Sequence, residues 1–164
     1  MYFVTICAAE RRCIFGEISG SDAVLSPVGE IVRSCWTDIP QHFPNVKIET
    51  HVLMPNHLHG VLTITSKLSS AGFQDKSERV TESFGMPTPK SIPTIIRSFK
   101  SAASKRIREL GLADGDSICQ RGYYEHVIRN TEEYVEVTNY ILLNPARWGN
   151  DEENPNRVLG TDKL

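Results

Sequence analysis

Hydrophobic and polar residues follow a β-strand pattern through residues 46–64. Two apolar runs rich in β-branched residues stand on either side of Pro55 and Asn56. A Pro–Asn pair between two such runs is typical of a turn, so the pattern predicts a hairpin or a tight corner. Shorter β-rich runs predict further strands over residues 2–8 and 123–129.

Three other segments repeat their apolar residues every three or four positions, which predicts amphipathic helices. They cover residues 28–40, 91–110 and 131–144. Each begins at or just after a side chain that can accept a hydrogen bond from the first helical turn, and these predicted N-caps are Ser26, Ser91 and Asn130. The elements therefore follow one another as strand, helix, hairpin, helix, strand and helix.

Polar segments connect and follow these elements. Residues 9–27 are predicted as a connecting loop, in which a short strand near residues 24–25 is an option. Residues 66–90 are rich in Ser, Gly, Pro and charge, which predicts a long flexible loop. Residues 150–164 are acidic and then rich in Pro and Asn, which predicts a tail. We therefore expect a single domain over residues 1–149.

The composition is that of an ordinary globular protein. The chain has 164 residues, 40% of them hydrophobic and 23% charged, and is long enough for a proper core. It has no run of about 18 apolar residues, so neither a transmembrane helix nor a membrane partner is expected. The four cysteines form no CxxC pair, so we expect reduced thiols in a cytoplasmic protein. The chain opens directly in a β-rich run without a signal-peptide pattern, which suggests that the natural chain begins further upstream.

The net charge of −2 gives no general attraction to nucleic acid, so any DNA contact must come from a local patch. The helix predicted over residues 91–110 offers such a patch, because its polar face carries mostly cations. The predicted phosphate-binding residues are Arg97, Lys100, Lys105, Arg106 and Arg108, together with Arg121 and Arg129 beside the last strand. The alternative, that this face is only a solvated helix surface, stays open.

His57 and His59 begin the second strand of the predicted hairpin. Because side chains alternate along a strand, the two imidazoles project from the same face. Two imidazoles at this spacing can bind one metal ion. The alternative is that one histidine is a polar residue on the sheet face and that the other is exposed.

The helix predicted over residues 131–144 carries a second candidate, Tyr140. We expect its core-facing residues to be Tyr134, Val137 and Ile141. Tyr140 lies about 100° away from their centre, and Asn144 follows one turn later on the same edge. A tyrosine at this edge is accessible to a substrate. The alternative is a boundary residue that buries its ring and exposes its hydroxyl, which is the commoner arrangement of such tyrosines.

Four stretches of the chain, in order, carry a resemblance to a known family. They are YFVTICAAERRCIFGEI, VLMPNHLHGVL, CQRGYYEHVIRN and NYILLNPARW. The second resembles the signature of the HUH superfamily, in which two histidines flank a hydrophobic residue. Together they resemble the single-tyrosine HUH transposases, and within these the REP-associated tyrosine transposases. The resemblance covers nearly the whole chain and implies a ferredoxin-like α+β fold with an antiparallel sheet and helices packed on one face.

The resemblance also implies the roles of four residues. His57 and His59 match the metal ligands, Asn144 matches the third ligand, and Tyr140 matches the catalytic tyrosine. The chain departs from the family pattern in two places. Cys119 stands where the family usually has Trp, which alters packing, and the family's basic stretch upstream of the first strand is absent, which affects recognition of a specific DNA sequence.

The implied activity is metal-dependent nicking and strand transfer on single-stranded or hairpin DNA. The tyrosine takes the 5′ phosphate as a covalent phosphotyrosine and leaves a free 3′-OH. Mg²⁺ or Mn²⁺ suits phosphate oxygens and water, and the two imidazoles favour Mn²⁺. The sequence leaves open whether the protein acts as a monomer or as a homodimer.

Two other functions stay open. A non-catalytic nucleic-acid-binding module would carry aromatic residues on exposed strand positions, and the chain has no RNP-type string. A zinc metallohydrolase would need a third ligand near His57 and His59. His51 is near in the sequence, but the turn breaks the even spacing. Tight stoichiometric zinc would favour this hydrolase.

Overall fold

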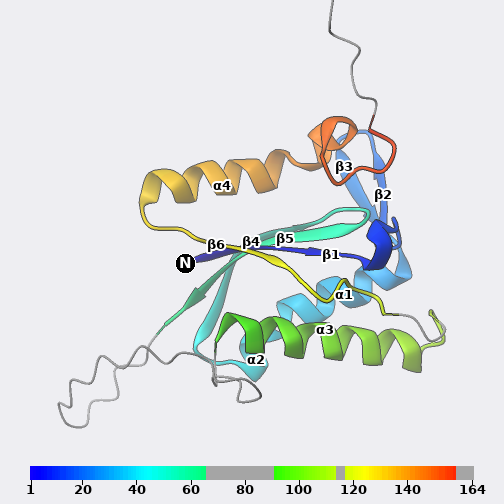
Figure 1. The fold of residues 1–164 in the computed structure, drawn as a ribbon, viewed down its shortest axis with the longest axis horizontal. Helices are drawn as coiled ribbons and strands as arrows, with labels where there is room; N and C mark the ends of the chain where they lie inside the picture. The colour runs from blue at the N-terminus through cyan, green and yellow to red at the C-terminus, as the bar shows by residue number, and fades with distance from the viewer. Residues whose placement is uncertain (66–90, 114–116, 158–164) are drawn as a thin grey trace, which may run out of the picture.

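A four-stranded antiparallel sheet forms the centre of the fold. The computed structural model describes residues 1–65, 91–113 and 117–157. The strands stand in the order β4 (Val46–Leu53), β5 (His57–Ile64), β1 (Tyr2–Cys7) and β6 (Tyr124–Val127). Helices α1 (Pro27–Thr37) and α3 (Ile92–Glu109) cover one face, and α4 (Thr131–Leu143) lies across the other (Figure 1). This order and these connections are ferredoxin-like. The predicted α+β class, with an antiparallel sheet and a helical layer on one face, is therefore confirmed, and α4 adds a further helix opposite that layer.

The central hairpin joins β4 and β5 as predicted. The two strands pair from Val46 opposite Ile64 to Leu53 opposite Leu58. The turn between them is closed by a hydrogen bond of 2.8 Å from the amide of Met54 to the carbonyl of His57. Since β5 also pairs with β1, the first residues of β5 lie inside the sheet and not at its edge.

Each of the three long helices begins at its predicted N-cap. The cap side chain accepts a hydrogen bond from a backbone amide in the first turn. The pairs are Ser26 with Gly29, Ser91 with Thr94 and Asn130 with Glu133, at 3.0, 3.4 and 2.8 Å. The first helix is shorter than predicted, because α1 ends at Thr37 and a separate short helix, α2 (Ile39–His42), follows. Pro40 explains the break, since it has no amide hydrogen to continue α1.

A second hairpin occupies part of the segment predicted as a connecting loop. Strands β2 (Gly16–Ser19) and β3 (Asp22–Leu25) pair only with each other. The loop prediction was wrong here, although the short strand near residues 24–25 exists as part of β3. Strands of four residues are too short to show a clear alternation in the sequence. The loop predicted over residues 66–90 lies outside the described residues.

The two faces of the sheet have separate cores. On the face of α1 and α3, the main cluster contains Val4, Leu58, Leu62, Trp36 and Ile95. On the face of α4, a smaller cluster contains Val61, Ile128 and Ile141, with Tyr134 and Val137 packed against it. The predicted core-facing side of the last helix is therefore confirmed. Because side chains alternate along β5, His57 and His59 share the α4 face with Val61.

Candidate active site

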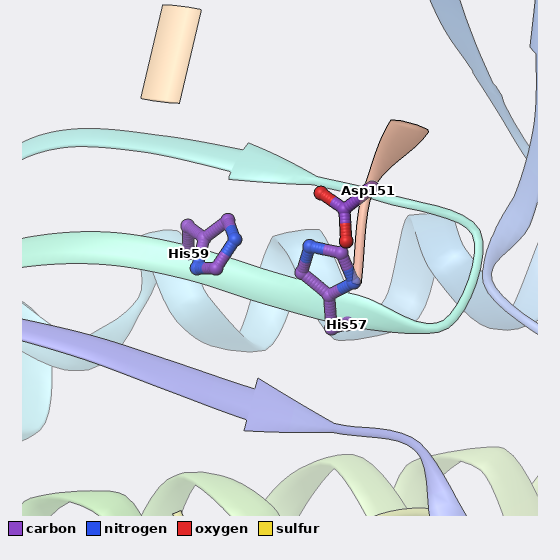
Figure 2. A group of neighbouring side chains, drawn as sticks. All are labelled: His57, His59 and Asp151. Atoms are coloured by element: carbon purple, nitrogen blue, oxygen red, sulfur yellow. The ribbon is translucent and has the colours of Figure 1, made fainter. Parts of the chain in front are cut away.

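His57 and His59 lie next to each other on β5, directly after the turn. Their ring centroids are 4.4 Å apart, and the side chains are buried, at 0% and 4% exposure. Figure 2 shows both rings rising from the same strand, with the carboxylate of Asp151 beside His57. The sequence prediction that the two imidazoles share one face is confirmed.

Hydrogen bonds orient both rings through their Nδ1 atoms. The Nδ1 of His59 lies 2.8 Å from the hydroxyl of Thr5, and the Nδ1 of His57 lies 2.9 Å from the Oδ1 of Asn56. The amide nitrogen of Asn56 donates to the carbonyls of Arg11 and Glu153 at 3.1 and 2.6 Å, so its oxygen faces the imidazole. An amide oxygen can only accept, which assigns the proton of His57 to Nδ1 and leaves a lone pair on Nε2.

This Nε2 of His57 is buried and has no hydrogen-bond partner among the described residues. Burial lowers the pKa of His57 to about 4, with Asp151 acting in the opposite direction. Burial and the neighbouring His57 lower the pKa of His59 to about 3. Both imidazoles are therefore neutral at pH 7, and a neutral imidazole held through one nitrogen presents the other as a metal ligand.

Asp151 completes a group of side chains that could hold a metal ion. One ligand atom each from His57, His59 and Asp151 lie within 4.8 Å of one another. The carboxylate of Asp151 also accepts a hydrogen bond of 3.2 Å from the Nδ2 of Asn144. Asn144 is buried, and its Oδ1 has no partner within the described part of the chain. Neutral imidazole nitrogens, a carboxylate and an unpaired amide oxygen suit a divalent cation.

The segment carrying Asp151 was predicted as a tail, and its first residues lie against the site. The 3-10 helix η2 (Pro145–Asn150) turns the chain back after α4. The carboxylate of Glu153 then lies 3.0 Å from the guanidinium of Arg11, and the carbonyl of Glu153 accepts from Asn56. These contacts join residues far apart in the sequence. No local pattern could identify Asp151, and its place in an acidic run after the last helix was the only signal.

Tyr140 reaches the same site from α4. Its hydroxyl lies 3.3 Å from the Nε2 of His59, and the ring packs edge-on against Phe3, with centroids 6.2 Å apart. The side chain is 42% exposed, so it is accessible from solvent. Burial, and next the charge of Asp151, raise the pKa of Tyr140 above its ordinary value, so the phenol is protonated at neutral pH.

An open cleft of about 710 Å³ leads to this group. Its lining residues come from β1, β5, β6, α4 and the segment after α4. They are Phe3, Thr5, His59, Tyr124, Tyr140, Asn144, Arg147, Asn150, Asp151, Glu152 and Glu153. The predicted residues His59, Tyr140 and Asn144 therefore meet in one cleft, with His57 buried beside it.

Family membership is decided by a relative from Haemophilus influenzae. That protein, which is described only as uncharacterized, is 35% identical over 151 residues, covering 92% of this chain and 83% of the relative. The chain belongs to the family of this Haemophilus protein. No family model matches the chain.

A solved structure shares the fold of this chain. It is that of a REP-associated tyrosine transposase bound to a REP hairpin, and it superposes with a TM-score of 0.56 at 20% identity. The match covers 89% of this chain and 66% of the transposase chain, so the chain spans just under two thirds of that protein. At this identity the comparison supports the fold. In addition, no helix in the described part of this family member is long and apolar enough to cross a membrane.

The basic residues predicted to bind phosphate do not gather at the cleft. Helix α3 lies on the opposite face of the sheet from α4 (Figure 1). Lys100 donates to three backbone carbonyls, of Gln120, Arg121 and Gly122, at 2.8, 3.2 and 2.7 Å. The remaining predicted cations are all exposed and do not line the cleft; they are Arg97, Lys105, Arg106, Arg108, Arg121 and Arg129. Among the described residues that line the cleft, Arg147 is the one Lys or Arg, and the sequence analysis missed it.

His51 does not join the metal-binding group. It pairs with Gly60 across β4 and β5, and directly opposed residues project from the same face. The tip of Trp36, in the core of α1 and α3, lies 2.3 Å from where a Cβ on Gly60 would stand. His51 therefore projects toward the face opposite His57 and His59, and it does not supply the third ligand that a hydrolase would need.

Proposed function

We propose that this protein is a transposase that nicks and rejoins single-stranded or hairpin DNA, with Tyr140 as its nucleophile. The observation that carries the proposal is the distance of 3.3 Å between the Tyr140 hydroxyl and His59, at the edge of a group suited to a divalent metal. The shared fold with a tyrosine transposase bound to a DNA hairpin supports the same conclusion. Such an enzyme acts where the DNA is, in the cytoplasm.

His57 and His59 would hold the metal through their Nε2 atoms. For the third ligand we retain two candidates, Asn144 through its unpaired Oδ1 and Asp151 through its carboxylate. We propose Mn²⁺ or Mg²⁺, since a site with imidazole and oxygen ligands that must also accept phosphate oxygens suits these ions. When bound, such an ion polarises a phosphate oxygen and orients the scissile phosphodiester.

The residues of the chain supply the rest of the reaction. Phe3 packs against the Tyr140 ring and His59 lies beside its hydroxyl, so the nucleophile is held at the cleft. Attack joins the Tyr140 oxygen to phosphorus and releases a 3′-OH, which takes up a proton while the phenol loses one. One ester replaces another, so a later attack by a 3′-OH can rejoin the strands without an external energy source. All of these groups belong to one chain, which supports a site that does not require a homodimer.

The test is a covalent adduct on hairpin DNA. The protein is incubated with Mn²⁺ and a hairpin oligonucleotide labelled on the 3′ side of the expected cleavage, and the products are separated under denaturing conditions. The proposal predicts that the label moves with the protein and that peptide mapping places it on Tyr140. Label found only on free DNA fragments would contradict a tyrosine nucleophile.

A zinc hydrolase remains the second candidate, because two histidines and a carboxylate are a common catalytic zinc set. The two functions differ in their products and in their metal. The hydrolase would bind one tight zinc ion and release product without a covalent intermediate. The transposase would bind Mn²⁺ or Mg²⁺ more weakly and become covalently attached to DNA.

A further inference from the structure

Tyr124 is a large aromatic side chain that the reaction described above does not use. It lies on β6, an edge strand of the sheet, and is 58% exposed although it lines the cleft. No hydrogen bond to its hydroxyl is found within the described residues. A large aromatic ring that is open to solvent at the mouth of a polar cleft is accessible to a ligand bound in that cleft.

Tyr124 stands in one row with the residues of the site. Thr5 on β1 is opposite His59 on one side and opposite Tyr124 on the other. Directly opposed residues project from the same face, so Tyr124, Thr5 and His59 all point toward the cleft. Two strand spacings separate the backbones of Tyr124 and His59, which is on the order of 10 Å. A group bound on Tyr124 is therefore a close neighbour of whatever is bound at the histidines.

Phe3 fixes the position of this ring. Its centroid lies 6.1 Å from that of Tyr124 in an edge-on contact, 6.2 Å from that of Tyr140 and 5.4 Å from that of His59. The Tyr124 ring is thus held from one side by its edge-on neighbour. Helix α4 packs over β4 and β5 and leaves β6 largely uncovered.

The charge of the cleft determines what can cover Tyr124. Asp151, Glu152 and Glu153 line the cleft, against one cation, Arg147, among the described lining residues. Such a wall repels the phosphates of a DNA backbone except where a metal or Arg147 offsets it, but it does not repel an uncharged nucleobase. Bases also stack on aromatic rings in single-stranded nucleic acids.

We propose that Tyr124 is a base-stacking site for the nucleotide next to the scissile phosphate of single-stranded DNA. This inference rests on the proposed function and names the part of the substrate that the cleft recognises. Tyr124 would position the substrate through its base, while Tyr140 attacks the neighbouring phosphate. Since every base has an aromatic face, this site contributes affinity and register more than sequence preference.

The experiment measures binding without cleavage, in the presence of a metal chelator. Fluorescence anisotropy gives the Kd for a hairpin oligonucleotide with single-stranded flanks, and for a series in which one flanking base at a time is removed as an abasic site. The proteins compared are wild type, Tyr124→Ala, Tyr124→Phe and, as a control, Leu142→Ala, which removes an exposed side chain outside the cleft. Circular dichroism and thermal unfolding verify that each variant is folded.

We expect Tyr124→Ala to weaken binding about tenfold, which lies within the range measured for base–aromatic stacking, and Tyr124→Phe to stay within about twofold. One abasic position should weaken wild-type binding by a similar factor and have no further effect on Tyr124→Ala. Wild-type affinity in Tyr124→Ala would overturn the proposal. So would a further loss of affinity in Tyr124→Ala at every abasic position, because no base would then depend on Tyr124. Loss of the covalent adduct in Tyr124→Phe would also overturn it, because Tyr124 would then be the nucleophile.

The binding cycle needs neither metal nor cleavage, so its outcome is separate from that of the proposed function. If one abasic position has no further effect in Tyr124→Ala but no covalent adduct forms, the transposase is rejected and the stacking site is retained. A covalent adduct on Tyr140, together with further losses of affinity in Tyr124→Ala at every abasic position, would retain the transposase and reject the stacking site.

Discussion

Two buried imidazoles and one partly exposed phenol meet at the end of the β4–β5 turn. Each imidazole is held at Nδ1 by a neighbour, Thr5 or Asn56, and so turns its Nε2 toward the site. Burial keeps both rings neutral, which is the state that binds metal. At the residue scale these side chains could therefore hold a cation without changing their protonation state.

The lowered pKa values of His57 and His59 predict how stability depends on pH. In the unfolded chain both rings take up protons near their ordinary pKa of ~6.5, while in the fold they do so only near 4 and 3. The free energy of unfolding should therefore fall as pH decreases below ~6.5, by about 1.4 kcal/mol per pH unit for each histidine. Urea unfolding of the metal-free protein between pH 7 and 5 measures this. In His57→Gln the slope should decrease by the contribution of one histidine, while His59 and His51, whose pKa burial also lowers, keep theirs. The same slope in both proteins would contradict the account.

Asp151 and Asn144 compete for the role of third ligand. If Asp151 binds the metal, Asp151→Asn should weaken Mn²⁺ binding more than about tenfold, because a charged oxygen ligand is lost. Isothermal titration calorimetry measures the affinity, and Glu152→Gln is the matched control, since it removes a neighbouring charge from the same cleft. Equal losses in the two variants would mean that only the general field was changed. An unchanged affinity in Asp151→Asn would leave the role to Asn144.

At the scale of elements, the sequence predicted those parts that depend on neighbours along the chain. The hairpin, the three N-caps and the apolar side of α4 follow from turn residues and periodicity, and all are present. The hairpin of β2 and β3 and the break before α2 were missed, since short strands show little alternation and a single proline was outweighed by the surrounding pattern. Asp151 was missed for a different reason. It accepts a hydrogen bond from the amide of Glu153, which in turn contacts Asn56 and Arg11, about 100 residues or more earlier in the chain.

Helix α3 shows the same limit, since its cations looked equivalent in the sequence. Lys100 differs from the others because its Nζ donates to the carbonyls of Gln120, Arg121 and Gly122 and holds the segment before β6. We expect Lys100→Met to lower the free energy of unfolding by about 2 kcal/mol, the range for hydrogen bonds to a charged group. Arg97→Ala, at an exposed position of the same helix, should change it by less than about 0.5 kcal/mol. Equal stability of the two variants in chemical denaturation would contradict this role.

At the scale of the whole molecule, the sheet separates two surfaces. The cleft with Tyr140 lies on the α4 face. Helix α3, which carries most of the predicted cations, lies on the other face (Figure 1). DNA bound in the cleft must pass around an edge of the sheet to reach α3. Phosphate contacts on α3 are therefore expected only for DNA that is long enough to extend from the cleft around this edge.

The double variant Arg97→Ala, Arg108→Ala tests this extent. If DNA reaches α3, the variant should bind all sequences more weakly, and the slope of log affinity against log salt should decrease by about two at most. Filter binding or anisotropy at several salt concentrations, with short and long oligonucleotides, measures it. An unchanged slope with the long DNA would show that this face is only a solvated helix surface.

The assignment of Tyr140 as the nucleophile is the central claim, and one comparison of variants tests it directly. Tyr140→Phe removes a single oxygen, which lies 3.3 Å from His59, and leaves the ring contact with Phe3. Tyr134→Phe, on the same helix but packed toward the core, is the matched control. With hairpin DNA and Mn²⁺, we predict that Tyr140→Phe binds the DNA, unfolds at the wild-type temperature and forms no covalent adduct, while Tyr134→Phe forms it normally. A covalent adduct in Tyr140→Phe would contradict the account.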